Sequence, residues 1–359
     1  MRVALIGDFS KSDSPTGPKF FASEFLQEIN KHYEAWFYRY NCSERPCKWK
    51  QKLTGRIETD HENKIITGGL LPLLIHFIRN KYEIVHIVNY IRVSIPFLLW
   101  AKFSKTKILY TLHGVVANEM KYSNNTGLGY KLKNLLAEKL ISLLADNITG
   151  VSRSVCNKFR EYYPVKIDKF KFLPPGLNIN CFPHRQKRKD QKIRIITLKG
   201  MNANYKFLSN LEDIVGKEGE RFQLTIIGDA DESKSTDNIR YKTRLSRNEW
   251  ISELTQHDIF INISRSETFS LAALEAFAIG LTLFLHTDIG ITEYLNPGYD
   301  YNSYNQNDLT SLQAALQSIA PTDEKINEVI EARECKLKNF SIQEVGNEYI
   351  LQYTSLVKR

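Results

Sequence analysis

Short apolar runs of strand length alternate with helix-length segments along the first half of the chain. The runs are rich in β-branched and aromatic residues, and they lie at 2–9, 35–40, 82–89, 107–114, 147–152 and 169–176. Apolar strands that alternate with helices are typical of a parallel sheet covered by helices on both faces. We therefore predict an α/β domain over residues 1–178.

The alternation begins again after a polar stretch. Residues 179–192 contain the basic run HRQKRKDQK, which has the composition of a linker. The strands expected after it are 193–200, 221–229, 258–264 and 281–286, and the expected helices are 204–217, 247–256, 268–280 and 308–319. This pattern predicts a second doubly wound α/β domain over 193–340, followed by a closing helix at 341–359 with apolar residues at helical spacing. Because ligands bind beyond the carboxyl ends of such strands, we expect a ligand cleft between the domains.

Composition and length limit the class of protein. A chain of 359 residues with 42% hydrophobic residues is long enough for two folded domains and is not typical of disorder. The apolar run at the N-terminus is too short for a signal peptide, and polar residues or prolines interrupt the other apolar tracts. The five cysteines are widely spaced. We expect reduced thiols, a cytoplasmic location and no transmembrane helix.

Positive charge is concentrated in the first half of the chain. Residues 1–165 carry 24 Lys and Arg against 14 Asp and Glu, whereas residues 166–359 carry 25 against 26. Such a surplus favours an anionic partner, and the alternative is a solvated lysine-rich surface. Nucleic acid is the weaker candidate because no nucleic-acid-binding motif accompanies the charge. Residues 130–144 could rest on anionic lipid at the inner face of the membrane, or could turn their leucines to the core and their lysines to water.

The segment SETFSLAALEA at 266–276 contains two glutamates. It follows a buried strand and predicts a turn and then a helix that Thr268 or Ser266 caps and Gly280 ends. The free N–H groups at the start of such a helix form an anion site. If a phosphate binds there, Glu267 would accept hydrogen bonds from sugar hydroxyls and Glu275 from a ribose diol. The alternative for Glu275 is a structural salt bridge.

The region around this segment resembles the signature of the retaining glycosyltransferases of family 4. That signature has two glutamates separated by seven residues and then Gly-x-x-Glu, matched here by Glu267, Glu275, Gly290 and Glu293. Further matches occur in order along nearly the whole chain: TGPKF, TLHG, VSRSV, PPGLN and IIGD. The resemblance implies the GT-B fold, in which two Rossmann-like domains face a central cleft and the final helix returns to the first domain.

The resemblance also implies roles for individual residues. His113 would approach the donor sugar near the reacting carbon, Glu267 would lie against the sugar hydroxyls, and Lys206 would neutralise the leaving diphosphate. No metal, cofactor or protein nucleophile is required. The remaining residues expected to bind the donor are Gly17, Lys199, Gly228, Thr268, Phe269, Ser270, Leu271 and Glu275.

The chain departs from the family pattern at three positions. Met201 stands where the family usually has an arginine, whose charge Lys199 could supply, and Thr268 and Ser270 stand where it often has glycines. These departures indicate either altered donor choice or lost activity. Asp229 and Asp231 spell the Asp-x-Asp of metal-dependent transferases, but we interpret them as a loop near the nucleotide.

The sequence thus predicts a retaining glycosyltransferase that moves a sugar from a nucleotide-diphosphate donor, with UDP favoured over GDP. The expected acceptor is a saccharide or a lipid-linked saccharide in polysaccharide assembly. One alternative is a non-catalytic GT-B subunit that serves an active transferase. A sugar-nucleotide epimerase is the other, and the order of the motifs in the second domain disfavours it.

Overall fold

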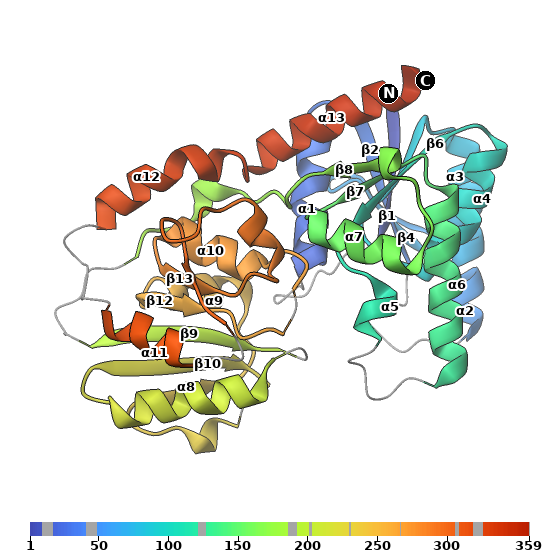
Figure 1. The fold of residues 1–359 in the computed structure, drawn as a ribbon. Helices are drawn as coiled ribbons and strands as arrows, with labels where there is room; N and C mark the ends of the chain where they lie inside the picture. Colours follow the sequence, from blue (N-terminus) through green and yellow to red (C-terminus); the bar gives the residue numbers. More distant parts are fainter. Residues whose placement is uncertain are drawn as a thin grey trace. The chain divides into compact units, whose positions relative to one another are not determined.

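A computed structural model describes the chain in ten stretches: residues 1–8, 17–40, 49–120, 127–185, 192–200, 203–229, 231–265, 267–305, 309–318 and 326–358. The chain divides into two compact units (Figure 1). Unit 1 contains Met1–Asn178 together with Phe340–Arg359, and unit 2 contains Ile179–Asn339.

Within the described residues, unit 1 holds an eight-stranded sheet in the order β3-β4-β2-β1-β5-β6-β7-β8. Neighbouring strands run parallel except β3 and β4, which run antiparallel. All six strands expected in the first half are present, and the β3–β4 pair was not predicted. The strands are β1 (Arg2–Gly7), β2 (Glu34–Tyr40), β3 (Glu58–Asp60), β4 (Ile65–Gly68), β5 (Ile84–Ile87), β6 (Lys107–Leu112), β7 (Asn147–Gly150) and β8 (Phe170–Phe172).

The helices of unit 1 cover this sheet, and the last helix of the chain is one of them. They are α1 (Gly17–Ile29), α2 (Trp49–Thr54), α3 (Leu70–Asn80), α4 (Ile95–Phe103), α5 (Val116–Glu119), α6 (Leu128–Leu144), α7 (Arg153–Tyr162) and α13 (Ile342–Lys358), with 3-10 turns at η1 (Arg92–Ser94) and η2 (Ile167–Lys169).

Helix α13 packs against α1 over the core of unit 1. Its tyrosines reach the sheet: the Tyr353 hydroxyl lies 2.6 Å from His86 Nδ1, and the Tyr349 hydroxyl lies 2.9 Å from Thr111 Oγ1. These buried polar contacts fix the helix on this sheet, because unmaking them would leave buried groups unpaired. The predicted return of the final helix to the first domain is confirmed.

Unit 2 is built on a six-stranded parallel sheet in the order β11-β10-β9-β12-β13-β14, within the residues described. The four predicted strands are present, and the two edge strands, β11 and β14, were not predicted. The strands are β9 (Ile193–Lys199), β10 (Phe222–Gly228), β11 (Ile239–Lys242), β12 (Ile259–Ile261), β13 (Thr282–Leu285) and β14 (Asn302–Ser303). All three residues of β12 are buried, as are four of the seven residues of β9.

The helices of unit 2 include the predicted helix after β12, which begins later than expected. They are α8 (Tyr205–Lys217), α9 (Arg247–Leu254), α10 (Leu271–Ile279), α11 (Leu309–Ser318) and α12 (Ile326–Lys338), with 3-10 turns at η3 (Ile179–Cys181), η4 (Glu232–Lys234) and η5 (Gly290–Glu293).

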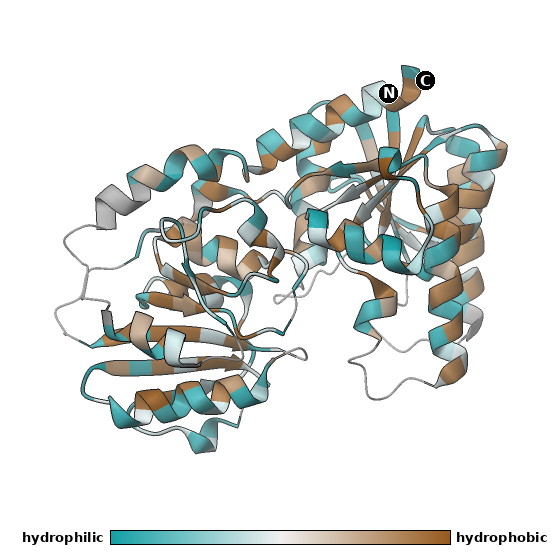
Figure 2. Cartoon of the chain, in the orientation of Figure 1, coloured by the Kyte–Doolittle hydropathy of each residue, from teal (hydrophilic) through white to brown (hydrophobic). Residues whose placement is uncertain are grey.

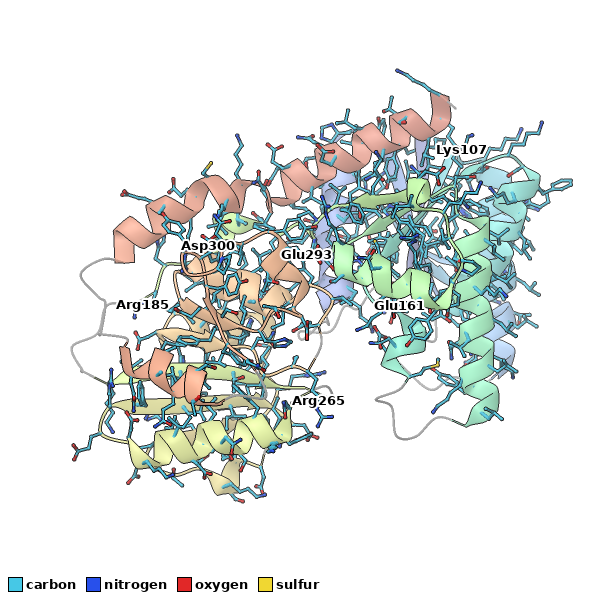
Figure 3. The ribbon with its side chains drawn as sticks, in the orientation of Figure 1. Lys107, Glu161, Arg185, Arg265, Glu293 and Asp300 are labelled. Carbon is cyan, nitrogen blue, oxygen red and sulfur yellow. The ribbon has the colours of Figure 1, made fainter. Side chains whose placement is uncertain are left out.

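Helix α12 is fixed to unit 2 by buried polar contacts. Arg333 donates to the backbone carbonyls of Phe277 and Leu281 at 3.0 and 2.9 Å, and Lys336 forms an ion pair with the buried Asp300 (Figure 3). The residues before β9 also pack on this unit, because Arg185 forms an ion pair with Asp258. Two α/β units with largely parallel sheets, the first of which includes the final helix, confirm the predicted fold class. No described helix is long and apolar enough to cross a membrane.

Candidate functional site

Asn262 organises the carboxyl end of β12. Its side-chain amide donates to Glu267 Oε2 at 2.7 Å and to Ser270 Oγ at 3.0 Å. Its side-chain oxygen accepts from the N–H of Ser264 at 2.9 Å, and its backbone carbonyl accepts from the Tyr304 hydroxyl. One buried side chain therefore fixes both the glutamate and the residue that opens α10.

Ser270 is the N-cap of α10. Its hydroxyl accepts from the N–H of Ala273 at 3.3 Å, and its backbone is left-handed with φ 82°. Thr268 does not cap the helix as predicted, because the helix begins at Leu271, and Ser266 lies outside the described residues. The predicted end is confirmed: Gly280 closes the helix in a left-handed conformation with φ 103°.

The start of α10 presents free backbone donors. In the described part of the chain, the N–H groups of Leu271 and Ala272 donate no hydrogen bond, and both residues are partly exposed. The first N–H groups of a helix carry a partial positive charge. They can therefore bind an anion such as a phosphate.

The second half of the glutamate motif folds back onto the first half. The N–H of Gly290 donates to the carbonyl of Glu267 at 3.0 Å, and the N–H of Ile291 donates to that of Phe269 at 2.9 Å. The Phe269 ring packs edge-on against Tyr294, with the ring centroids 5.8 Å apart. The turn between β12 and α10 is therefore held by residues that follow α10 in the chain, as well as by Asn262, which precedes the turn.

The two glutamates of the motif have different surroundings. Glu267 is partly exposed, and burial raises the pKa of its carboxyl against the hydrogen bonds from Asn262 and its neighbours. Glu275 is buried within α10, where it accepts from Arg247 and from Trp250 Nε1 at 2.6 Å. Burial also raises the pKa of Glu275, and the charge of Arg247 opposes this. The alternative foreseen for Glu275, a structural salt bridge, is present, and its ribose role stays a prediction.

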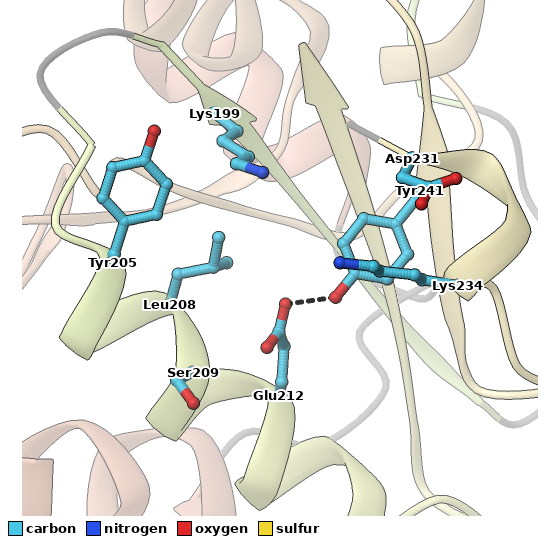
Figure 4. A pocket seen from close by; sticks show the side chains of 8 residues that line it. All are labelled: Lys199, Tyr205, Leu208, Ser209, Glu212, Asp231, Lys234 and Tyr241. Carbon is cyan, nitrogen blue, oxygen red and sulfur yellow. Dashed lines mark hydrogen bonds between the residues drawn. The ribbon is translucent and has the colours of Figure 1, made fainter. Parts of the chain in front are cut away.

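Lys199 and Gly228 lie side by side at the ends of β9 and β10. Gly228 has φ 141°, and a Cβ there would lie 2.2 Å from the Lys199 carbonyl oxygen, so only glycine fits. Lys199 Nζ lies 5.6 Å from the ring centroid of Tyr205. The side chains of Lys199 and Tyr205 line a pocket of about 190 Å³. Its other lining residues are Leu208, Ser209, Glu212, Asp231, Lys234 and Tyr241 (Figure 4).

Lys206 is exposed on the first turn of α8, and it does not line this pocket. Met201 lies outside the described residues. Of the predicted donor-binding residues in unit 2, the structure thus groups Glu267 to Leu271 at one strand end and Lys199 with Gly228 at two others. Among the residues described, no group of three His, Cys, Asp or Glu side chains is arranged to hold a metal.

His113 follows β6 in unit 1, and its ring lies 5.2 Å from that of Phe21 on α1. Burial lowers the pKa of His113 to about 4, so the ring is neutral near pH 7. Gly17, the predicted phosphate-approach residue, is the first residue of α1. Asn89, which was not predicted, ties this helix to β1: its side chain accepts from the N–H of Asp8 at 2.6 Å and donates to the carbonyl of Pro18 at 3.4 Å.

Glu138 on α6 holds the chain that follows His113. Its carboxylate accepts from the N–H of Val116 at 3.0 Å, from that of Ala117 at 3.3 Å and from the Tyr163 hydroxyl at 2.7 Å. The side chain is fully buried, and this burial raises its pKa to about 7. Nothing in the residue pattern indicated this role, because Glu138 is a single acidic residue among the lysines and leucines of α6.

Two family models match the chain. The model for Glycosyltransferase Family 4 matches residues 53–180, and the model for Glycosyl transferases group 1 matches residues 184–334. Together they account for most of both units. The chain is a family-4-like glycosyltransferase.

Solved structures of the same fold are similar to the glycosyltransferase over almost its full length. A sucrose-phosphate synthase from Thermosynechococcus elongatus is 17% identical over 99% of this chain and 98% of its own, with a TM-score of 0.72. HepE from Anabaena in complex with UDP is 12% identical over 99% and 100%, with a TM-score of 0.70. The lipopolysaccharide outer core galactosyltransferase WaaB is 14% identical over 98% and 99%, with a TM-score of 0.66. No curated protein sequence matches the glycosyltransferase.

The sequence-based prediction missed Asn262 in unit 2 and Asn89 in unit 1. Each is a polar residue just after a mostly apolar strand, in DIFINIS and YEIVHIVN. A buried amide needs partners, so a polar side chain in such a run could have been marked as a candidate for a tertiary hydrogen-bond role.

The left-handed backbone of Ser270 should destabilise the glycosyltransferase, and the cap that the Ser270 hydroxyl provides for α10 should offset this cost. Ser270→Ala should lower the free energy of unfolding by about 1–2 kcal/mol, because the cap is lost and the left-handed backbone remains. Ser270→Gly should change it by less than about 0.5 kcal/mol, because relief of the backbone offsets the lost cap. Urea unfolding of both variants measures this, and equal losses in the two would contradict it.

Glu138 should make stability depend on pH. Its pKa is about 7 in the folded protein against 4.5 as the ordinary value, so its destabilising effect grows as pH rises between these values. Over this pH range the contribution of Glu138 should lower the free energy of unfolding by about 3 kcal/mol. Glu138→Gln does not titrate and should lose this decline between pH 5 and pH 8, as followed by thermal unfolding.

The matched control for this experiment is Glu161→Gln, an exposed glutamate on α7. It should retain the wild-type dependence on pH. A constant offset between wild type and Glu138→Gln at every pH would show that Glu138 does not titrate in this range.

Proposed function

We propose that this glycosyltransferase is a retaining enzyme that moves a sugar from a nucleotide-diphosphate donor to a saccharide or lipid-linked saccharide acceptor. A UDP-sugar is the favoured donor, and polysaccharide assembly is the favoured process. The observation that carries the proposal is the strand end at Asn262, where Glu267 lies next to the free amides of α10. Structures of Anabaena HepE with UDP and with UDP-glucose support the choice of donor.

The chemistry explains why these groups would be useful together. Cleaving the bond between sugar and diphosphate develops negative charge on the leaving oxygen. The amides of Leu271 and Ala272 would stabilise that charge, with Lys199 and Lys206 as candidate cations, and preformed donors of this kind supply a large part of catalysis. Glu267 would orient the donor sugar through its hydroxyls.

His113 is proposed to contact the donor sugar as a neutral hydrogen-bonding group. Because its pKa is about 4, it would not add positive charge near the anomeric carbon, where positive character develops. We propose no protein nucleophile and no metal. The basic first unit, with 24 Lys and Arg in residues 1–165, would contact an anionic membrane or acceptor at the cytoplasmic face.

Donor binding and turnover test this proposal. Saturating UDP-glucose should raise the unfolding temperature by several degrees, more than GDP- or ADP-glucose, because it binds only the folded state. Glu267→Gln keeps the shape of the side chain, and it should lower release of UDP from the donor at least about 100-fold. The control is Glu220→Gln, an exposed glutamate in the turn after α8, which should leave turnover unchanged.

Two outcomes would contradict the proposal in different ways. If no donor of the panel is hydrolysed or raises the unfolding temperature, the chain is better explained as a non-catalytic subunit of a transferase complex. If the donor is interconverted to another sugar nucleotide without an acceptor, it is an epimerase.

A further inference from the structure

Helix α6 turns its leucines to solvent. The side chains of Leu128, Leu132, Leu136, Leu140 and Leu143 are between 41% and 84% exposed. They recur every three or four residues and so form one stripe along the helix. This is the reverse of a core-facing helix, and of the two alternatives left open for residues 130–144 it excludes the one in which the leucines point inward.

The inward side of α6 carries three polar residues beside Ala137 and Ile141, and hydrogen bonds fix it there. Its buried residues include Asn134, Glu138 and Ser142. Asn134 Oδ1 accepts from the Tyr90 hydroxyl at 2.9 Å, and Glu138 accepts from the backbone of α5 and from Tyr163. Rotating the helix to bury the leucines would unpair these groups at about 1–3 kcal/mol each. The exposed leucine stripe is therefore a fixed feature of unit 1.

Two neighbouring helices extend the apolar stripe. Helix α4 contacts both α3 and α6. It exposes Leu99 and Phe103, the latter by 79%, and α3 exposes Leu71 and Ile75. With Tyr130, ten of the sixteen large hydrophobic side chains that are exposed in the described residues lie on these three helices. Brown, hydrophobic segments recur along α6 in Figure 2. We name this region the α3–α4–α6 surface.

The helices of the α3–α4–α6 surface expose only basic charges, and one of these, Lys102, is paired with Asp146, which follows α6. The three helices carry five basic residues, and their one acidic residue, Glu138, is fully buried. The basic residues are Arg79, Lys102, Lys131, Lys133 and Lys139. Exposed leucines among lysines are typical of helices that lie in the interface of an anionic membrane.

We propose that the α3–α4–α6 surface docks unit 1 on an anionic phospholipid bilayer. The leucine stripe of α6 would enter the interfacial layer, and the lysines would contact lipid phosphates. A second copy of the chain fits less well, because a symmetric contact through this surface would bring the two sets of basic residues together. This docking rests on the membrane contact proposed for the basic first unit and assigns it to particular helices, and it is independent of the donor chemistry proposed for unit 2.

Vesicle flotation of the full chain tests the proposal. The chain should bind vesicles of phosphatidylglycerol and phosphatidylcholine more tightly than vesicles of phosphatidylcholine alone, and binding should fall as salt rises. The triple variant Leu132→Ser, Leu136→Ser, Leu140→Ser should bind at least about tenfold more weakly. Lys133→Gln should weaken binding by about fivefold.

The matched control is the triple variant Ile167→Ser, Leu351→Ser, Val357→Ser, whose three residues are exposed in unit 1 but outside the α3–α4–α6 surface. It should bind vesicles like the wild type, and circular dichroism should show that both triple variants are folded. Equal binding by the two triple variants, or no binding to anionic vesicles, would overturn the proposal. So would a dimer in solution that only the Leu132, Leu136 and Leu140 substitutions dissociate.

Turnover of the donor, measured without lipid on the same samples, separates this inference from the proposed function. Lost vesicle binding with intact donor hydrolysis in the leucine variant supports the docking surface. Vesicle binding by a wild type that hydrolyses no donor would contradict the proposed enzyme and leave the surface standing.

Discussion

The hydrogen bonds of Asn262 are the constraint on which the candidate site depends. One amide side chain, at the end of a buried strand, donates to Glu267 and Ser270 and accepts from the backbone of Ser264. The backbone carbonyl of Asn262 accepts a hydrogen bond from the Tyr304 hydroxyl. Because a buried amide without partners is costly, this set of bonds resists any other arrangement of the turn. The glutamate and the start of α10 are thereby placed before any ligand arrives.

The remainder of the site follows from that placement. The N–H groups of Gly290 and Ile291 bond the turn from a second segment, so the turn is held on two sides. Ser270 keeps a left-handed backbone that a serine rarely adopts, and its hydroxyl caps α10 in return. The strained residue lies next to the free N–H groups at the start of α10. Strained backbone is often found in functional sites.

Much of this architecture could be predicted from the sequence, because buried parallel strands are apolar runs and their order is set by alternation with helices. The strand Glu58–Asp60 was missed because it is polar, and the start of α10 was misplaced because Ser270 is held by tertiary contacts. The sequence left two orientations open for α6, and only the buried partners of Asn134 and Glu138 decide that its leucines face solvent. The glutamate pattern identified the candidate site, while the sequence could mark Asn262 only as a polar residue after an apolar strand, and its partners became known only from the structure.

The central claim is that the Asn262 hydrogen bonds present α10 and Glu267 to a nucleotide-diphosphate donor. Calorimetric titration of UDP-glucose into wild type and Asn262→Asp tests it most directly, because aspartate keeps the shape but replaces the donating amide by a carboxylate facing Glu267. We expect the affinity to fall at least about tenfold in a variant whose circular dichroism matches the wild type. An unchanged affinity in a folded variant would contradict the account.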